Sequence, residues 1–256
     1  MWELICINAA ARMSRLDGGN YRLEMPMKAG DIMTSSVVSV DSETPVKRIA
    51  KLMSERRISA VPVIDADHRV IGIISEGDLL RRAETGTARQ RSWWLELLAT
   101  NKELAGEYLK SHGRTAKDVM TREVVTVKES TPLSEVADIL ESRHIKRVPV
   151  LRNGKLVGIV SRANLVQLLA SARLTPPASS AQEDRAIREK LLAELKTQKW
   201  ADASPGNIVV TDRIVHLWGQ VLSDEEQRAL RAAAANIPGV RAVKDHTNVL
   251  PVVPIV

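Results

Sequence analysis

Phenylalanine is absent from this 256-residue sequence, and aromatic residues of all kinds make up only 3% of it. A packed interior must therefore be built from branched aliphatic residues, alanine and methionine, which suits layered structure of mixed helices and strands. The hydrophobic share of 44% is ample for such cores, and the chain is long enough for two domains.

Cysteine occurs once, as Cys6. A single thiol excludes an internal disulfide framework and a zinc site of several thiolates, so a reducing cytoplasm is the predicted location. No run approaches the roughly 20 apolar residues that a membrane-spanning helix needs. Residues 1–27 begin with a short apolar stretch that no basic segment precedes, and we predict a disordered extension or an upstream misassigned start.

Positive charge is in moderate excess, with a formal net charge of +6 and a pI near 9.6. This balance favours anionic partners, but interspersed Lys, Arg, Asp and Glu are equally typical of ordinary solubility charge. The sequence has no helix-turn-helix signature, zinc finger or basic-aromatic platform, so nucleic acid is not a predicted partner. It also lacks a phosphate loop, paired metal ligands and a catalytic-triad pattern, so neither an enzyme nor a metal site is predicted.

An internal repeat organises most of the chain. Residues 31–34, Asp-Ile-Met-Thr, recur as Asp-Val-Met-Thr at 118–121, and the Val-Pro-Val of residues 61–63 recurs at 148–150 in the same register. So many matches indicate a duplication. Each repeat reads as strand, helix, strand, strand, helix, and two such units should pack together because each alone leaves an apolar sheet face uncovered.

Local signals punctuate the repeats. Thr44 and Thr131 are predicted helix N-caps, each followed by proline at the first helical position. Asn153-Gly154 predicts a type I′ hairpin turn. An inserted segment, residues 85–114, is predicted to be helical from Ser92 to a stop at Gly113, with Trp93-Trp94 either on a partner surface or packed on the repeats.

A linker rich in Pro, Ser and Thr is predicted at residues 173–183, and a separate small domain at 184–256. This domain reads as helix, strand, strand, helix, strand, with a capping box at Ser223 opening the second helix. His216 and His246 lie in strand segments without a further ligand at metal spacing, so no metal is predicted there.

The repeated regions, residues 28–84 and 115–172, resemble a tandem pair of CBS domains, called a Bateman module. The resemblance rests on the Asp-x-Met-Thr opening, the Val-Pro-Val strand and the closing Gly-x-x-Ser stretch, which Asp78 extends in the first repeat. It implies two βαββα repeats in a pseudo-twofold pair, which together with the small αββαβ domain gives a fold of the α/β and α+β classes. It also implies a homodimer and an adenine-nucleotide effector (ATP, ADP, AMP or S-adenosylmethionine), with no required cofactor.

The same resemblance implies the nucleotide-binding residues. Asp78 would hold the ribose, Gly72 would allow close approach of the ligand, and Ser75 would cap the helix or contact ribose and phosphate. Asn164 replaces the acid in the second repeat, so that cleft should bind more weakly, differently or not at all. Lys146 and Arg147 would neutralise phosphates, or else form a solvated basic edge. The backbone of Val61 and Pro62, with Ile58 nearby, would form the apolar slot for the adenine, and Thr34 is a polar candidate beside it. The full predicted set is Thr34, Ile58, Val61, Pro62, Gly72, Ser75, Asp78, Lys146, Arg147, Val148, Pro149, Ser161 and Asn164.

The C-terminal domain resembles a BON domain, through Leu-Trp-Gly-Gln-Val at residues 217–221 and Ile-Pro-Gly-Val-Arg-Ala-Val at 237–243. The resemblance implies attachment to phospholipid surfaces, with Trp200 and Trp218 either at a lipid interface or in the core. The sequence therefore predicts a non-catalytic regulatory protein that couples nucleotide binding in the CBS clefts to a BON adaptor. The alternative is a phospholipid-surface adaptor in which the CBS pair serves only for dimerisation.

Overall fold

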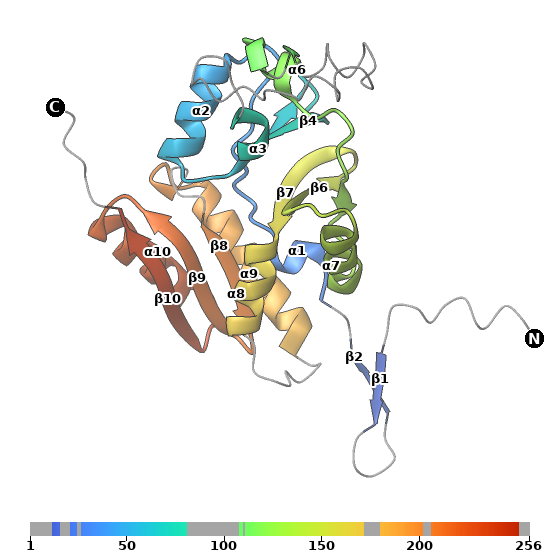
Figure 1. Ribbon diagram of the computed structural model, residues 1–256. Helices are drawn as coiled ribbons and strands as arrows, with labels where there is room; N and C mark the ends of the chain where they lie inside the picture. Colours follow the sequence, from blue (N-terminus) through green and yellow to red (C-terminus); the bar gives the residue numbers. More distant parts are fainter. Residues whose placement is uncertain are drawn as a thin grey trace, which may run out of the picture. The chain divides into compact units, whose positions relative to one another are not determined.

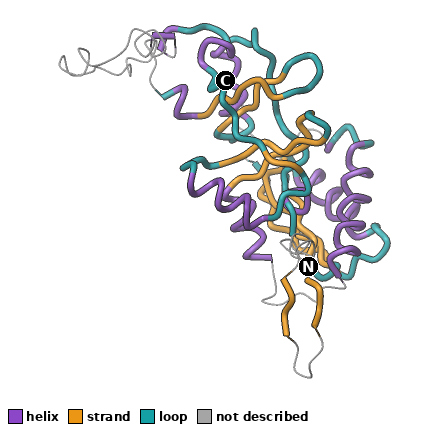
Figure 2. Tube along the Cα trace, turned by 90° about the vertical axis from the view of Figure 1, so that its right-hand side faces the viewer, coloured by secondary structure: helices purple, strands orange, loops and turns teal. Residues whose placement is uncertain are grey.

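The computed structural model describes residues 12–15, 21–24, 27–80, 108–109, 111–171, 180–201 and 206–250 (Figure 1). The predicted helix start at Ser92 and the Trp93-Trp94 pair lie outside these ranges. Two compact units emerge: a first unit of residues 38–125 and 153–156, and a second unit of residues 1–37, 126–152 and 157–256. Both units contain helices and strands, as the colouring in Figure 2 shows.

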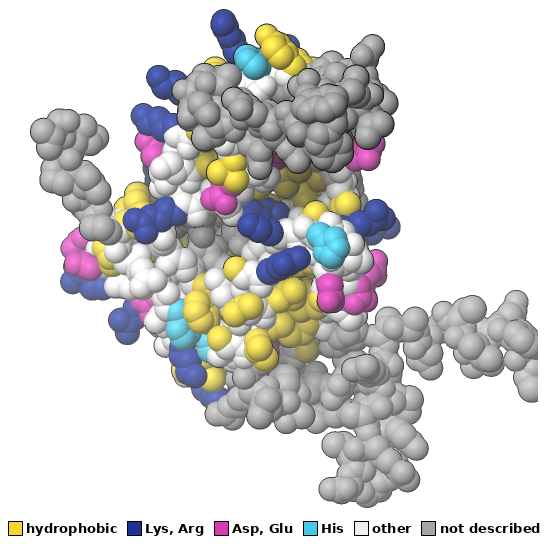
Figure 3. All heavy atoms as spheres, in the orientation of Figure 1, with side chains coloured by type: hydrophobic (Ala, Val, Ile, Leu, Met, Phe, Trp, Pro, Cys, Tyr) yellow, Lys and Arg dark blue, Asp and Glu magenta, His cyan; other side chains and the backbone are white. Residues whose placement is uncertain are grey.

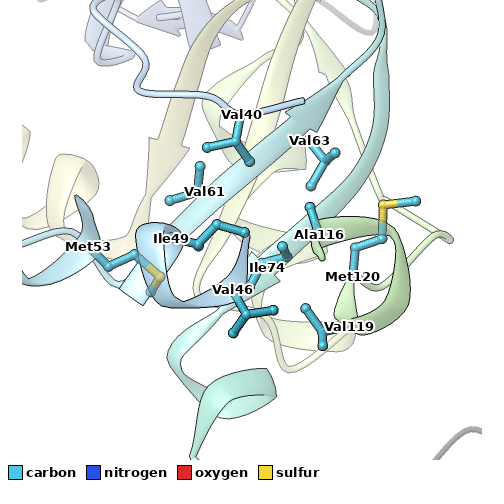
Figure 4. Close-up of a cluster of buried hydrophobic side chains, with 10 residues drawn as sticks. All are labelled: Val40, Val46, Ile49, Met53, Val61, Val63, Ile74, Ala116, Val119 and Met120. Atoms are coloured by element: carbon cyan, nitrogen blue, oxygen red, sulfur yellow. The ribbon is translucent and has the colours of Figure 1, made fainter. Parts of the chain in front are cut away.

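The first unit is built on an antiparallel pair of strands covered by amphipathic α2. Val46, Ile49 and Met53 lie on one face of that helix and are buried, as its helical spacing requires. Figure 4 shows Val46 and Ile49 turned toward Ile74 in the core of this unit. The elements are α2 (Val46–Glu55), β3 (Ala60–Ile64), β4 (Val70–Ser75), α3 (Glu76–Leu79) and α6 (Ala116–Val119).

The second unit contains the C-terminal domain and the sheet of the second repeat, apart from residues 153–156 at the turn between its last two strands, which are assigned to the first unit. In the repeat, β5 pairs in parallel with β6, and the strand order is β5-β6-β7. Asn153 and Gly154, with φ values of 51° and 77°, confirm the predicted type I′ turn between β6 and β7. The elements of the repeat are α1 (Ala29–Ile32), β5 (Val127–Lys128), α7 (Leu133–Ser142), β6 (Arg147–Arg152), β7 (Lys155–Ser161) and α8 (Arg162–Ser171).

Each repeat is completed by the opening segment of the other. The segment after α6 forms a bridge between Thr121 and Ile73 of β4, whereas the segment after α1 forms a bridge between Thr34 and Ile159 of β7. Residues 116–121 therefore belong to the sheet of the first repeat, and residues 29–34 to that of the second. The contiguous repeat boundaries predicted from the sequence do not express this exchange.

The predicted helix caps are shifted by one residue. α2 and α7 begin at Val46 and Leu133, and the cap positions are held by Pro45 and Pro132 without a side-chain hydrogen bond. Both prolines are extended, with ψ of 137° and 144°. They form bridges with Thr115 and Lys28 respectively, which holds them outside the helices. The prediction that proline occupies the first helical position was therefore wrong.

The predicted αββαβ order of the C-terminal domain is confirmed. Its sheet has the order β10-β9-β8, with β10 parallel and β8 antiparallel to β9. At the start of α10, Ser223 Oγ accepts the Glu226 N–H, while the Glu226 carboxylate accepts the Leu222 N–H, one residue before the predicted partner. The elements are α9 (Ser180–Lys196), which begins inside the predicted linker, β8 (Asn207–Thr211), β9 (Ile214–Val221), α10 (Asp224–Ala235) and β10 (Ala242–Val249).

The N-terminal segment is not wholly the predicted disordered extension. β1 (Arg12–Arg15) pairs antiparallel with β2 (Tyr21–Glu24), with Arg12 opposite Glu24 and Met13 opposite Leu23. The sequence between these strands contains Gly18-Gly19, a hairpin-turn signal. Within the described residues, no helix is long and apolar enough to cross a membrane.

Candidate functional site

The strand-to-helix junction of the first unit gathers Ser75, Asp78 and Thr121, here called the first cluster. Ser75 is the N-cap of α3, and both its N–H and its hydroxyl donate to Asp78 Oδ2, at 2.9 and 2.8 Å. Thr121 Oγ1 donates to Asp78 Oδ1 at a longer 3.4 Å. The carboxylate thus lies in the first turn of α3, where the positive end of the helix dipole favours its charge.

Thr121 was not among the predicted site residues, although the repeat pattern contained the signal. It occupies the same place in the second Asp-x-Met-Thr motif that Thr34 occupies in the first. The exchanged opening segments put Thr121 on Asp78 of the first repeat. Thr121 can be assigned to the first cluster only when the exchange of opening segments is known.

Gly72 is required for packing within the protein, independently of any ligand. A Cβ at this position would lie 2.8 Å from Met120 Cγ and 3.1 Å from Met120 Cβ, so a side chain here collides with the exchanged segment. Val61 is fully buried and Pro62 is also buried, while Ile58 packs partly buried against the same core. Any contact from Val61 to a base would therefore have to come from its backbone.

The second cluster consists of Thr34, Ser161 and Asn164. Asn164 is only 3% exposed, and its Oδ1 accepts the Ser161 N–H and hydroxyl at 2.8 and 2.6 Å. Its Nδ2 donates to the Ile32 carbonyl at 3.2 Å and to Thr34 Oγ1 at 3.3 Å. All four hydrogen-bonding positions of the amide are therefore used within the protein. Thr34, predicted beside the adenine slot of the first repeat, lies here instead because residues 29–34 belong to the second unit.

The remaining predicted residues of the second repeat lie on and before β6. Val148 and Pro149 are buried in the strand, Arg147 is half-buried at its start, and Lys146 is exposed just before it. The Lys146 carbonyl accepts the Arg162 N–H at the start of α8. The strand end that carries Lys146 and Arg147 is thereby joined to the turn that carries Ser161.

In the BON-like domain, His216 and His246 face each other across β9 and β10. His216 Nδ1 lies 3.2 Å from His246 Nε2, and the His246 ring stacks on the Trp218 ring with their centroids 3.9 Å apart. Trp218 Nε1 also donates to Ser171 Oγ at 3.3 Å. Two histidines do not complete a metal site, and the described residues contain no group of three or more His, Cys, Asp or Glu able to hold an ion.

Trp200 and Trp218 both line a pocket of about 80 Å³ in the second unit. Leu192 and Leu195 of α9 and Leu230 of α10 contribute apolar walls. Trp218 is engaged by its hydrogen bond and its ring contact, and Trp200 is half-buried. These contacts favour the core alternative for Trp218.

Acid should weaken this domain through His216. Burial, with a smaller contribution from the charges of His246 and Lys244, lowers the pKa of His216 to about 4. Because the unfolded chain has a pKa near 6.5 at this residue, it takes up the proton first as the pH falls. Stability is therefore complete above about pH 6.5 and should decrease by on the order of 1 kcal/mol toward pH 4.

Denaturant unfolding at pH 7, 5.5 and 4 measures this loss, with His216→Gln as the variant. The glutamine variant should lose less stability over this range than the parent chain. His68→Gln is the control, because His68 is exposed. Identical pH profiles for the parent and His216→Gln would contradict the assignment.

Comparison with known proteins agrees with this architecture. Residues 29–84 and 116–171 match the CBS domain family, and residues 183–251 match the BON domain family. The chain belongs to the CBS-domain proteins. It contains a tandem CBS pair, the Bateman module, followed by a BON domain.

Three relatives illustrate the likeness. CBSX1, a chloroplastic CBS domain-containing protein of Arabidopsis thaliana, is 34% identical over 150 residues, covering 54% of this chain and 62% of the relative. The uncharacterized protein MJ1426 of Methanocaldococcus jannaschii is 31% identical, covering 54% of this chain and 89% of the relative. The crystal structure of CBSX2 in complex with AMP superposes with a TM-score of 0.50 and 30% identity, covering 57% of this chain and 97% of that one. This chain spans only 62% and 61% of the two Arabidopsis relatives, CBSX1 and CBSX2.

Proposed function

We propose that this protein is a non-catalytic regulator that binds an adenine nucleotide in its CBS clefts, most strongly at the first cluster, and couples nucleotide binding to the BON domain. The observation that carries the proposal is the Asp78 carboxylate, oriented by Ser75 at the N-terminus of α3 and contacted by Thr121. A carboxylate in this place can accept hydrogen bonds from both ribose hydroxyls. The AMP complex of CBSX2 supports the choice of ligand class, since that relative is 30% identical over nearly its whole chain.

AMP is the first effector to test, with ADP, ATP and S-adenosylmethionine as the other members of the class. The first cluster is proposed as the stronger site, because Asn164 in the second cluster carries no charge and its amide is fully bonded within the protein. Lys146 and Arg147 are proposed phosphate contacts, since they border the turn at Ser161. The cytoplasmic location stays a prediction.

Self-association is also proposed, through α8. Val166 and Leu169 on this helix are 64% and 74% exposed, and Figure 3 shows hydrophobic side chains gathered on this part of the second unit. Exposed apolar side chains on one helix are typical of an interface. We propose that a second copy of this chain covers this face of α8, because the resemblance to CBS pairs predicts a homodimer. The alternative, in which the CBS pair serves only for dimerisation beside a lipid-binding BON domain, predicts that no adenine nucleotide binds.

Asp78→Asn is the sharpest test of the nucleotide site. The substitution should leave the fold intact, because Asn164 shows that an amide fits the equivalent junction. We expect about 10- to 100-fold weaker AMP binding, since a hydrogen bond to a charged group contributes about 1.5–3 kcal/mol. Isothermal titration calorimetry on the full chain measures the affinity.

Glu76→Gln is the matched control, because Glu76 is an exposed acid in the same helical turn. It should leave the affinity within about twofold of the parent. Equal affinities of the parent and Asp78→Asn, or no AMP binding by the parent at millimolar concentration, would overturn the proposal.

A further inference from the structure

Arg188 on α9 of the BON domain contacts the backbone of the CBS pair. This side chain is 5% exposed, and its guanidinium donates to three backbone carbonyls. Nε contacts Ile208 O at 2.9 Å, Nη1 contacts Gly30 O at 2.8 Å, and Nη2 contacts Met33 O at 2.6 Å. Gly30 lies in α1 and Met33 is its C-cap, so a cation from the BON domain occupies the end of α1 where carbonyl groups are left unpaired.

Arg185, one turn earlier on α9, contacts a side chain of the same short helix α1. It forms a bidentate ion pair with Asp31, with Nε–Oδ1 at 2.7 Å and Nη2–Oδ2 at 2.9 Å. The side chains are only 21% and 13% exposed. A paired, partly enclosed guanidinium of this geometry is both strong and orientation-specific. Two arginines of the BON domain thus fix both the backbone and a side chain of α1.

The other side of this segment forms the second cluster. Met33 packs against Gly158, where a Cβ would lie 2.8 Å from Met33 Cγ. Thr34 exchanges two backbone hydrogen bonds with Ile159, each of 3.0 Å, and its hydroxyl is contacted by Asn164. Residues 29–34 are therefore held between α9 on one side and the turn of Ser161 and Asn164 on the other.

We propose that Arg185 and Arg188 are positioning residues for the second cluster, so that docking of the BON domain and ligand binding at that cluster are thermodynamically linked. The inference deepens the proposed function and rests on it for the nature of the ligand. The corresponding segment of the first unit is held differently. Its Asp118 accepts hydrogen bonds from the Thr115 N–H and hydroxyl and from the Arg114 N–H, all within its own turn. The direct contacts of Arg185 and Arg188 therefore link the BON domain to the second cluster.

Hydrogen–deuterium exchange on the full chain tests this with one technique. Arg185→Gln and Arg188→Lys are the variants, the second of which retains the charge but cannot contact all three carbonyls. Lys190→Gln, an exposed cation on the same helix, is the matched control. Without ligand, the amides of Met33 and Thr34 should exchange at least about tenfold faster in both variants than in the control.

AMP titrations followed by exchange then give a midpoint for each cluster separately. Protection of residues 158–164 should require about 5- to 10-fold more AMP in Arg185→Gln than in the parent, within the usual range of coupling between sites. Protection of residues 72–78 should keep its midpoint within twofold. A merely structural role would leave both midpoints unchanged or shift them together, and either result overturns the linkage.

The other possible outcomes distinguish failure of the linkage from failure of the proposed function. Unchanged exchange at Met33 and Thr34 in both variants overturns the positioning role whether or not any nucleotide binds. Protection confined to residues 72–78 in the parent overturns the linkage but leaves the proposed function standing. Absence of protection at both clusters overturns the proposed function itself.

Discussion

Arg188→Ala is expected to destabilise the protein by about 3–5 kcal/mol in denaturant unfolding. The substitution leaves the carbonyls of Gly30, Met33 and Ile208 without the guanidinium, and each buried acceptor that loses its partner costs about 1–3 kcal/mol. The substitution also leaves a void, because the Arg188 side chain is only 5% exposed. The loss should be a large fraction of the total stability of such a chain.

The charge of Arg188 does not change this expectation. Burial lowers its pKa to about 10, and the nearby acids Asp31, Glu129 and Glu189 partly offset that effect. The guanidinium therefore stays protonated at neutral pH, and its hydrogen bonds to the carbonyls are charge-assisted. Lys190→Ala on the same helix is the control, expected within about 0.5 kcal/mol of the parent. A cost below about 1 kcal/mol for Arg188→Ala would show that these three contacts are not formed in solution.

Gly72→Ala has the second largest expected effect, a loss of about 1–3 kcal/mol. The new methyl group would collide with the buried side chain of Met120, which the exchanged opening segment brings onto β4. Truncating the methionine should relieve the collision. The double variant Gly72→Ala/Met120→Ala is therefore expected to be more stable than the sum of the two single effects predicts, by about 1 kcal/mol or more.

A thermodynamic double-variant cycle from urea unfolding measures that coupling. Gly77→Ala is the matched control, because a Cβ there meets only Ser75 Oγ at 3.5 Å. Alanine in α3 should be neutral or slightly stabilising, since it is the better helix former. Strict additivity in the cycle would contradict the contact between Gly72 and Met120, and with it the placement of residues 116–121 in the first unit.

Much of this architecture was predictable because duplication leaves a readable pattern. The repeated Asp-x-Met-Thr, Val-Pro-Val and Gly-x-x-Ser motifs gave the strand and helix order, and Asn153-Gly154 gave the hairpin. Ser75 was also predicted from the sequence as a possible helix cap, and in the structure it is the N-cap of α3 in a capping box with Asp78.

The exchange of opening segments was not predictable by the same means. Motifs as similar as residues 31–34 and 118–121 fit either sheet equally well, so their sequence does not show which repeat they complete. Thr34 was consequently assigned to the wrong neighbourhood, and Thr121 was overlooked. Tertiary contacts between Met33 and Gly158, and between Met120 and Gly72, decide the matter in the structure.

The residues that join the BON domain to the CBS pair were also hidden. Arg185 and Arg188 lie in a helix with many charged residues, where a solvated face is the ordinary interpretation. Helical spacing places Arg188 on the apolar face of Ile187, Leu191 and Leu195 and places Lys190 opposite, but it does not show which groups Arg188 contacts. Likewise His216 and His246 are 30 residues apart, and only the parallel pairing of β9 with β10 brings their rings together.

A crystal structure of the full chain grown with AMP is the most direct test of the central claim. We expect the ribose hydroxyls within hydrogen-bonding distance of Asp78, with Thr121 beside them and the nucleotide at higher occupancy at the first cluster than at the second. AMP bound with its ribose away from Asp78, or crystals without bound nucleotide at millimolar AMP, would contradict it.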